Sequence, residues 1–213
     1  MYQTVIFDLD GTLLNTLEDL TDSTNYALTS CGYPERTLEE VRQFVGNGIR
    51  KLIERAVPAG TNVEQTDKVF DIFRSYYFEH CQIKTRPYDG IMDLLQYLKE
   101  HSFQMAIVSN KNDAAVKELA KDYFSEYIDV AIGEREGIQK KPAPDSVFEA
   151  MRLLGAEPET TVYVGDSDVD YQTATNAGLD CVSVTWGFRN EEELRSLHPA
   201  YLIHKPEELK QIV

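Results

Sequence analysis

Four short polar segments, far apart in the chain, contain the residues whose types are best suited to catalysis or metal binding. They are Asp8-Leu9-Asp10-Gly11-Thr12, Ser109-Asn110-Lys111, Lys140-Lys141-Pro142 and Gly165-Asp166-Ser167-Asp168-Val169-Asp170. If Asp8, Asp10 and Asp166 meet, they concentrate negative charge, which carboxylates tolerate only beside a cation. Carboxylate and carbonyl oxygens without His or Cys favour a hard ion, and Mg²⁺ is the commonest such ion that keeps positions open for phosphate.

The other polar residues of these segments suit an anion. Ser109 and Lys141 can supply a hydroxyl donor and a positive charge, and Gly11 allows a tight bend that turns consecutive N–H groups toward one anion. A carboxylate, a metal ion, a hydroxyl and an ammonium around one point describe a phosphoryl-transfer site. The metal ion and the lysine would offset the repulsion between an attacking carboxylate and a phosphate dianion.

The elements that must position these segments are short, nearly continuous apolar runs. The runs are 5–7, 105–108, 128–132, 162–164 and 182–184, with a weaker one at 201–203. Such runs are typical of strands buried on both faces of a parallel sheet. From residue 91 onward, amphipathic helical patterns separate them, which predicts an α/β fold with a doubly wound parallel sheet. Because ligands bind beyond the carboxyl ends of such strands, the four polar segments should meet at one sheet edge.

Between the first two strands the alternation stops, and only helical periodicity remains. Four apolar stripes of helical spacing occur between residues 16 and 85, and Thr37-Leu38-Glu39-Glu40 has the pattern of a capping box. About seventy residues are too many for a connection. We therefore predict a four-helix domain at 16–85 inserted into an α/β domain made of 1–15 and 86–213.

In this order the four polar segments resemble the motifs of the haloacid dehalogenase-like superfamily, and the insert resembles its four-helix cap. Phe44-Val45-Gly46-Asn47-Gly48 and Trp186-Gly187-Phe188 resemble segments of phosphoglycolate phosphatases and their relatives. The resemblance implies a Rossmann-like core and Mg²⁺-dependent hydrolysis of a small phosphate monoester. Thr12 resembles the phosphatases, since related mutases usually carry Val there. Asn15-Thr16 departs from the Asp-Ser pair that often follows the first motif.

The resemblance also implies a role for each residue of the motifs. Asp8 would be the nucleophile that forms an aspartyl-phosphate, and Asp10 would be the general acid and then the general base. Mg²⁺ would be held by the Asp8 side chain, the Asp10 backbone carbonyl and Asp166, with Asp170 orienting its waters. The residues implied in binding the phosphoryl group are Gly11, Thr12, Ser109, Asn110 and Lys141.

One loop of the insert is a candidate for reading the rest of the substrate. Gly46-Asn47-Gly48 lies between two predicted helices, and Arg50 and Lys51 follow at once. N–H groups at the start of a helix favour an anion. Our hypothesis is that this loop binds a second negative group of a small substrate, such as a carboxylate. The alternative interpretation, a plain interhelical turn, is equally compatible with the sequence.

Composition narrows the class of protein. The chain has 213 residues, with 21 Lys and Arg against 36 Asp and Glu, for a net charge of −15. This charge disfavours nucleic acid and anionic membranes as partners. No apolar run is long enough to span a bilayer, the N-terminus lacks the pattern of a signal peptide, and three widely spaced cysteines indicate reduced thiols in the cytoplasm.

Several functions remain open at this point. A nucleotide, pyrophosphate or a sugar phosphate is an alternative substrate, phosphosugar mutase chemistry is an alternative reaction, and a non-enzymatic binding protein is a third class. The sequence does not identify the natural ester, and no apolar stripe indicates an oligomeric interface.

Overall fold

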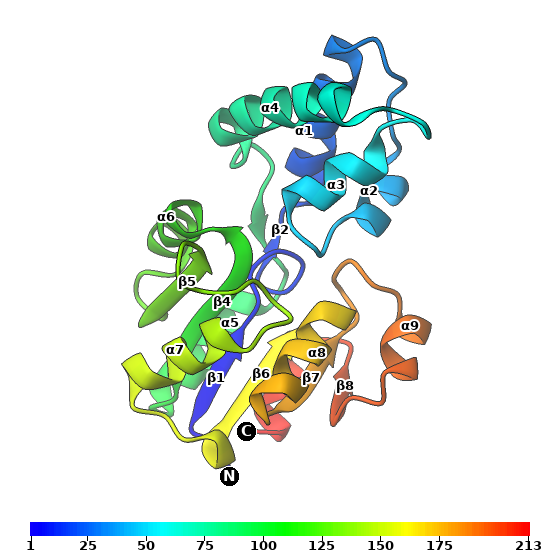
Figure 1. The fold of residues 1–213 in the computed structure, drawn as a ribbon. Helices are drawn as coiled ribbons and strands as arrows, with labels where there is room; N and C mark the ends of the chain where they lie inside the picture. Colours follow the sequence, from blue (N-terminus) through cyan, green and yellow to red (C-terminus); the bar gives the residue numbers. More distant parts are fainter. The chain divides into compact units, whose positions relative to one another are not determined.

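The computed structural model describes residues 1–213, which form two compact units (Figure 1). Unit 1 comprises Met1–Leu14 and Pro87–Val213, and unit 2 comprises Asn15–Arg86. At the two points where the chain passes from one unit to the other, β2 (Leu14–Asn15) pairs with β3 (Arg86–Pro87). These strands are too short to leave a periodic signal in the sequence, which did not predict them. None of the helices combines the length and the apolar character that crossing a bilayer requires.

Unit 1 is built on a six-stranded sheet in which every neighbouring pair is parallel. In spatial order the strands are β5 (Val130–Glu134), β4 (Gln104–Asn112), β1 (Thr4–Phe7), β6 (Thr161–Gly165), β7 (Asp180–Val184) and β8 (Tyr201–Ile203). The predicted α/β fold is thereby confirmed. Chain order reverses around β1, so the strands on either side of it, β4 and β6, carry two of the polar segments. This is the place where open parallel sheets bind ligands.

Helices cover both faces of this sheet. On one face α5 (Ile91–Glu100), α6 (Asp113–Phe124) and the 3₁₀ helix η2 (Pro206–Gln211) share an apolar cluster with Val5 and Phe7 of β1. On the other face α7 (Asp145–Leu154) and α8 (Asp168–Ala177) share a second cluster with Ile6. Successive side chains of a strand point to opposite faces, which is why β1 is apolar at three consecutive positions, Val5, Ile6 and Phe7.

Two further short helices lie in the connections of unit 1. They are the 3₁₀ helix η1 (Pro158–Thr160) before β6 and α9 (Glu191–Ser196) between β7 and β8. Strand β5 starts at Val130 rather than at the predicted Ile128. The Ile128 N–H instead donates to the Phe124 carbonyl at the end of α6, so residue 128 still belongs to the helix terminus.

Unit 2 consists of four helices, α1 (Leu17–Ser30), α2 (Leu38–Phe44), α3 (Ile49–Ala56) and α4 (Val63–His80). Their buried stripes include Leu28, Val41, Ile53 and Phe73, and α1 packs along α4. The capping box predicted at the start of α2 is present, with reciprocal hydrogen bonds between Thr37 and Glu40. Its two hydrogen bonds satisfy N–H groups that the helix leaves without an internal partner.

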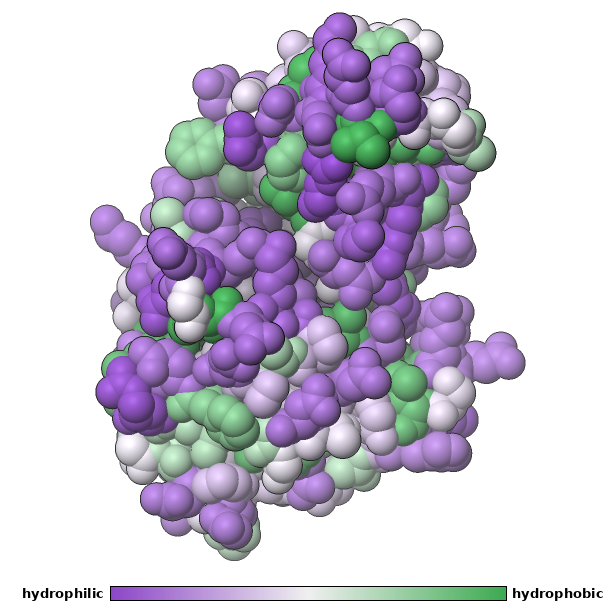
Figure 2. Space-filling model, viewed as in Figure 1, coloured by the Kyte–Doolittle hydropathy of each residue, from purple (hydrophilic) through white to green (hydrophobic).

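The surface of the molecule is predominantly hydrophilic on the face drawn in Figure 2, in keeping with the excess of charged residues. The three cysteines form no disulfide, and Cys181 is buried. Cys31 and Cys81, however, are only partly buried, because each lies at the carboxyl-terminal cap of a helix rather than on its apolar stripe.

Candidate active site

Three carboxylates from two segments meet at the carboxyl ends of the central strands. Asp8 directly follows β1, Asp166 directly follows β6, and Asp170 lies in the first turn of α8. One oxygen from each lies within 4.8 Å of the others, and all three residues are buried. One Mg²⁺ with bonds of ~2.1 Å joins oxygens up to about 4.2 Å apart, so the cluster is slightly wider than a bound ion would make it. The donor set is made only of oxygen, as a hard divalent ion requires.

Lys141 neutralises part of this charge from the loop before α7. Its Nζ donates to Asp8 Oδ1 and to Asp170 Oδ1, both at 2.7 Å, and contacts the Tyr163 hydroxyl at 3.1 Å. The lysine side chain is only 3% exposed. Burial opposes its charge, but Asp170 and Asp8 outweigh that effect and raise the pKa of Lys141. The lysine is therefore a fixed positive charge beside the predicted nucleophile.

A reciprocal clamp holds the backbone of Lys141 in place. Asn110 Oδ1 accepts a hydrogen bond from the Lys141 N–H at 2.8 Å, and Asn110 Nδ2 donates to the Lys141 carbonyl at 3.0 Å. The Pro142 carbonyl in turn accepts from Asn176 Nδ2 of α8 at 2.8 Å. The side chain of Asn110 is thus used to position the lysine, which leaves only its backbone to contact a phosphoryl group.

Asp170 has no free oxygen for direct metal binding. Its Oδ1 accepts from Lys141 and, at 2.9 Å, from the Tyr163 hydroxyl. Its Oδ2 accepts from the N–H and the hydroxyl of Ser167, which form the capping box of α8. The arrangement fits a residue that holds its neighbours rather than the ion itself.

Asp166 sits in a cradle that has room for no other side chain. Its Oδ2 accepts from the Phe188 N–H at 2.7 Å, and its Oδ1 accepts from the Thr12 hydroxyl at 3.2 Å. A Cβ at Gly11 would lie 2.5 Å from the Asp166 carboxylate, and a Cβ at Gly187 would lie 2.4 Å from it. Both glycines are needed because the backbone approaches the carboxylate so closely.

This cradle gives the segment 186–188 a function that the sequence did not specify. The Trp186 indole N–H donates to the Thr12 carbonyl at 3.0 Å, which ties this segment to the loop after β1. The Thr12 hydroxyl donates to Asp166, so the side chain of Thr12 supports the metal-site carboxylate rather than pointing to an anion.

The carboxyl groups of Asp8 and Asp166 have raised pKa values because the site concentrates like charge away from water. Burial, followed by the charge of Asp170, raises the pKa of Asp8 well above its ordinary range, although Lys141 acts in the opposite direction. Burial and Asp170 likewise raise the pKa of Asp166 to about 7. Such shifts mark a deficit of positive charge, which a divalent cation held by Asp8 and Asp166 would remove.

Ser109 is buried and lies in the last part of β4. Its Oγ accepts the Lys111 N–H at 3.1 Å, so the hydroxyl proton is directed elsewhere and can be donated to an anion. Asp10, two residues beyond Asp8, is paired with Lys111, whose Nζ lies 3.1 Å from Asp10 Oδ1. The sequence assigns no role to Lys111, because nothing local marks a strand-end lysine as a partner of a residue 101 positions away.

Comparison with known proteins agrees with this geometry. Residues 5–184 match the family model described as haloacid dehalogenase-like hydrolase. The chain belongs to this family. It is 34% identical over 205 residues to phosphoglycolate phosphatase 1 of Pseudomonas aeruginosa, covering 93% of this chain and 75% of that protein. It is 30% identical over 210 residues to phosphoglycolate phosphatase of Aquifex aeolicus, covering 98% of this chain and 95% of that protein.

Solved structures of the family are similar over almost the whole chain. One is the crystal structure of a protein from Lactobacillus delbrueckii subsp. bulgaricus that was named a phosphoglycolate phosphatase by inference. Its TM-score is 0.95 at 34% identity, and the match covers 99% of this chain and 98% of that chain. CbbY from Rhodobacter sphaeroides, solved in complex with phosphate, has a TM-score of 0.74 at 25% identity, and the match covers 98% of this chain and 96% of that chain. The predicted membership of the haloacid dehalogenase-like hydrolases is confirmed.

In unit 2 of this hydrolase, the predicted substrate loop is present between α2 and α3, but its cations are already paired. Arg50 donates to Glu54 at 3.0 Å and to Asp67, and Lys51 lies 2.7 Å from Glu54. The loop itself is tied down by Arg55, which donates to the Phe44 carbonyl at 2.7 Å and to Asn47 Oδ1 at 2.6 Å.

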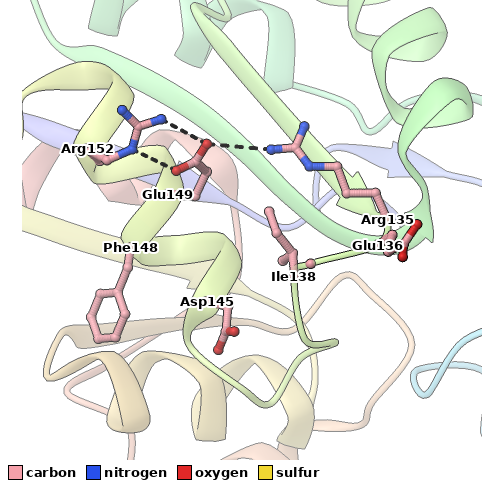
Figure 3. Close-up of a pocket in the computed structure, with 8 residues that line it drawn as sticks. Arg135, Glu136, Ile138, Asp145, Phe148, Glu149 and Arg152 are labelled. Carbon is pink, nitrogen blue, oxygen red and sulfur yellow. Dashed lines mark hydrogen bonds and ion pairs between the residues drawn. The ribbon is translucent and has the colours of Figure 1, made fainter.

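A hollow of about 500 Å³ opens elsewhere on unit 1, between α7 and the segment after β5 (Figure 3). Three of its charged groups are paired with one another, since Glu149 binds Arg152 at 2.8 Å and Arg135 at 3.6 Å. Phe148 of α7 is half exposed here. The hollow contains none of the residues of the strand-end cluster, and we assign it no chemistry.

Proposed function

We propose that this hydrolase is a Mg²⁺-dependent phosphatase that acts on a small phosphate monoester, with phosphoglycolate as the first substrate to test. The observation that carries the proposal is the nucleophile candidate Asp8, buried between Lys141 and the carboxylate of Asp166. The names of the similar proteins, phosphoglycolate phosphatases, support the choice of ester. Free thiols at all three cysteines support a reducing compartment, and we propose the cytoplasm.

In the proposed mechanism, the Asp8 carboxylate forms a bond to phosphorus as the bond from phosphorus to the ester oxygen breaks. Asp10 gives its proton to the departing alkoxide, which leaves as the alcohol. The product on the protein is an aspartyl-phosphate. Asp10, now a carboxylate, removes a proton from water as that water attacks phosphorus, which releases inorganic phosphate and restores Asp8.

The ammonium of Lys141 supplies positive charge beside the oxygens of the transferred group, and the hydroxyl of Ser109 binds them together with backbone N–H groups near Gly11 and Asn110. Because Lys141 is held by Asp170, Tyr163 and Asn110, its position is fixed before the substrate arrives. Preorganised charge of this kind stabilises a transition state without reorganisation during the reaction.

Mg²⁺ would be held by Asp8, Asp166 and the Asp10 backbone carbonyl. Asp170 would orient the residues around the ion by binding Lys141 and Ser167. When bound, the ion supplies positive charge that lowers the repulsion between the nucleophile and the phosphate dianion. The fit rests on the oxygen-only donor set and on the raised pKa values of Asp8 and Asp166.

We further propose that the loop Gly46-Asn47-Gly48, with Arg50 and Lys51, contributes to recognition of the leaving group. For either cation to bind a substrate carboxylate, it must exchange a partner, Glu54 or Asp67, for the ligand. Exposed ion pairs are weak, so the exchange costs little.

The test is phosphate release from a panel of esters in the presence of Mg²⁺ and again with a chelator. The panel includes phosphoglycolate, a sugar phosphate, a nucleoside monophosphate, pyrophosphate and p-nitrophenyl phosphate. We expect Mg²⁺-dependent release from at least one small monoester, with phosphoglycolate preferred. Release from none of them would overturn the phosphatase proposal, and isomer interconversion of a sugar phosphate without release would identify a mutase instead.

A further inference from the structure

The pair Asp10–Lys111 lies outside the hydrogen-bond network that fixes the nucleophile. Lys141 binds both Asp8 and Asp170, whereas the side chain of Asp10 contacts only Lys111, at 3.1 Å through Oδ1. The second oxygen of Asp10, Oδ2, accepts no hydrogen bond. The Lys111 side chain is 8% exposed and that of Asp10 is 17% exposed, so the pair is largely shielded from water.

The backbone of Lys111 is held in a fixed position by its own strand and the next. The register between β4 and β5 shifts between Val108 and Asn112, which is the signature of a bulge. Gly133 of β5 packs so closely that a Cβ there would lie 2.6 Å from the Lys111 carbonyl oxygen. The Lys111 N–H donates to Ser109. Bulges next to active sites re-aim a side chain, and here the side chain reaches Asp10.

We propose that Lys111 is a positioning residue that holds the Asp10 carboxylate in one orientation, with Oδ1 on the ammonium and Oδ2 left for proton transfer. This inference rests on the proposed function, in which Asp10 protonates the departing alkoxide. A charge-assisted hydrogen bond restricts the rotation of a carboxylate that otherwise has no partner. A small displacement of a proton donor is costly, since proton transfer requires hydrogen-bond distance to the leaving oxygen.

The proposal has a consequence that a merely structural role lacks. An alkyl ester has a poor leaving group that needs the proton of Asp10, whereas p-nitrophenolate leaves without much help. The ratio kcat/KM reports only the steps up to the first irreversible one, which includes departure of the leaving group. Loss of Lys111 should therefore lower kcat/KM more for alkyl than for aryl phosphates.

The experiment compares the full chain with Lys111→Met and Lys111→Arg, using an alkyl phosphate that the wild type hydrolyses and p-nitrophenyl phosphate. We expect Lys111→Met to lower kcat/KM for the alkyl ester about 10- to 100-fold more than for the aryl ester, and Lys111→Arg to recover most of the loss. Lys117→Met is the matched control, because Lys117 is an exposed lysine of α6 paired with Asp113, and it should leave both rates unchanged.

A double-mutant cycle with Asp10→Asn makes the test specific. If Lys111 acts through Asp10, the double variant loses no more alkyl-ester activity than Asp10→Asn alone. Equal losses for the two ester classes, or losses that add in the double variant, would overturn the proposal. Lys111→Gln, which keeps a donor without the charge, provides the same comparison if the methionine variant is poorly folded. If the wild type releases phosphate from neither ester, the proposed function fails rather than this inference.

A crystal structure of Lys111→Met provides a readout that does not depend on activity. We expect the Asp10 carboxylate to occupy more than one orientation there, and a single orientation identical to that in the wild type would contradict the positioning role.

Discussion

The strand-end cluster of unit 1 and the Gly46–Gly48 loop of unit 2 handle charge in opposite ways. In the cluster, Lys141 binds Asp8, a residue 133 positions away, and is nearly inaccessible to water. Beside the loop, Arg50 and Lys51 are 37% and 58% exposed and share a partner, Glu54, within the same helix. Buried long-range pairs fix geometry, whereas exposed local pairs are weak and exchangeable. In the proposed mechanism the chemistry therefore belongs to unit 1, and the ion pairs beside the loop can exchange for a group of the substrate.

The balance of charge supports the same contrast. The four carboxylates Asp8, Asp10, Asp166 and Asp170 are bound by two lysines, Lys111 and Lys141, and Arg189 acts on Asp166 electrostatically, which still leaves an excess of negative charge. One divalent cation offsets that excess. The pairs around the loop, in contrast, balance locally and call for no further ion.

The largest expected effect comes from replacing Lys141, the buried cation of the strand-end cluster. Lys141→Met leaves Asp8 and Asp170 without their cation, so we expect kcat to fall about 10³-fold and the unfolding free energy to fall by about 3–5 kcal/mol. Phosphate release and urea unfolding measure the two effects. The neighbouring Lys140 is half exposed and pairs only with Glu134, so Lys140→Met should change neither. Similar losses in both variants would remove the distinction between buried and exposed pairs.

A second prediction tests the cradle around Asp166 through Gly187. An added Cβ would lie 2.4 Å from both the Asp166 carboxylate and the Gly11 carbonyl, so Gly187→Ala must displace the carboxylate. We expect Mg²⁺ affinity, measured by calorimetry, to fall about 10- to 100-fold. Gly155→Ala is the control, because it also strains the chain, at a glycine with φ +65°, but no side chain or backbone atom lies within 4 Å of the added Cβ, so Mg²⁺ affinity should not change. Unchanged affinity in Gly187→Ala would show that the cradle does not set the metal site.

The third prediction concerns pH, and its sign follows from the raised carboxyl pKa values. Asp166 has a pKa of about 7 in the folded chain, against 3.8 for an ordinary Asp. Between these values the folded state binds more protons than the unfolded state, so metal-free stability falls as pH rises toward about 7. Mg²⁺ competes with those protons, so the rise in Tm on adding Mg²⁺ should be larger near pH 8 than near pH 6.

Thermal melting with and without Mg²⁺ at the two pH values is the measurement. Asp166→Asn, which removes the titrating group, should make the rise in Tm on adding Mg²⁺ less dependent on pH. A rise in Tm that is the same at both pH values would contradict the assignment of Mg²⁺ to these carboxylates.

The smallest expected effect concerns the exposed ion pairs beside the Gly46–Gly48 loop. Arg50→Ala should lower kcat/KM about two- to fivefold for a phosphate ester that carries a carboxylate, and leave an ester without one unaffected, because exposed ion pairs contribute little. Steady-state kinetics with both esters decides the point. If no carboxylated ester responds, Arg50 has no part in substrate recognition and remains a partner of Glu54 and Asp67 alone.

The sequence predicts the carboxylates of the cluster well because their places follow from the strands. Asp8 and Asp166 come directly after continuous apolar runs, and in a parallel sheet such ends converge. Lys141 lies on a loop without periodicity, so its charge suggested a partner for an anion, but only the resemblance to a known motif implied that it belongs to the site. The match of the family model over residues 5–184 then confirmed the family.

Other features of the site left no signal in a single sequence. Tyr163 reads as one more apolar residue of β6, yet its hydroxyl binds Asp170 and contacts Lys141. Gly187 is required by a close approach of backbone from a distant segment, and the bulge that aims Lys111 depends on pairing with β5. Each arises from long-range packing, which local patterns do not encode.

The central claim is that Asp8 attacks phosphorus within a buried, Mg²⁺-binding cluster. Asp8→Asn tests it most directly, since asparagine keeps the volume of the side chain and can still accept a hydrogen bond from Lys141. The variant should melt at the same temperature as the wild type or higher, because it removes a buried charge, while Mg²⁺-dependent phosphate release falls by about 10³-fold or more. A folded Asp8→Asn protein that releases phosphate at a rate close to that of the wild type would contradict the account.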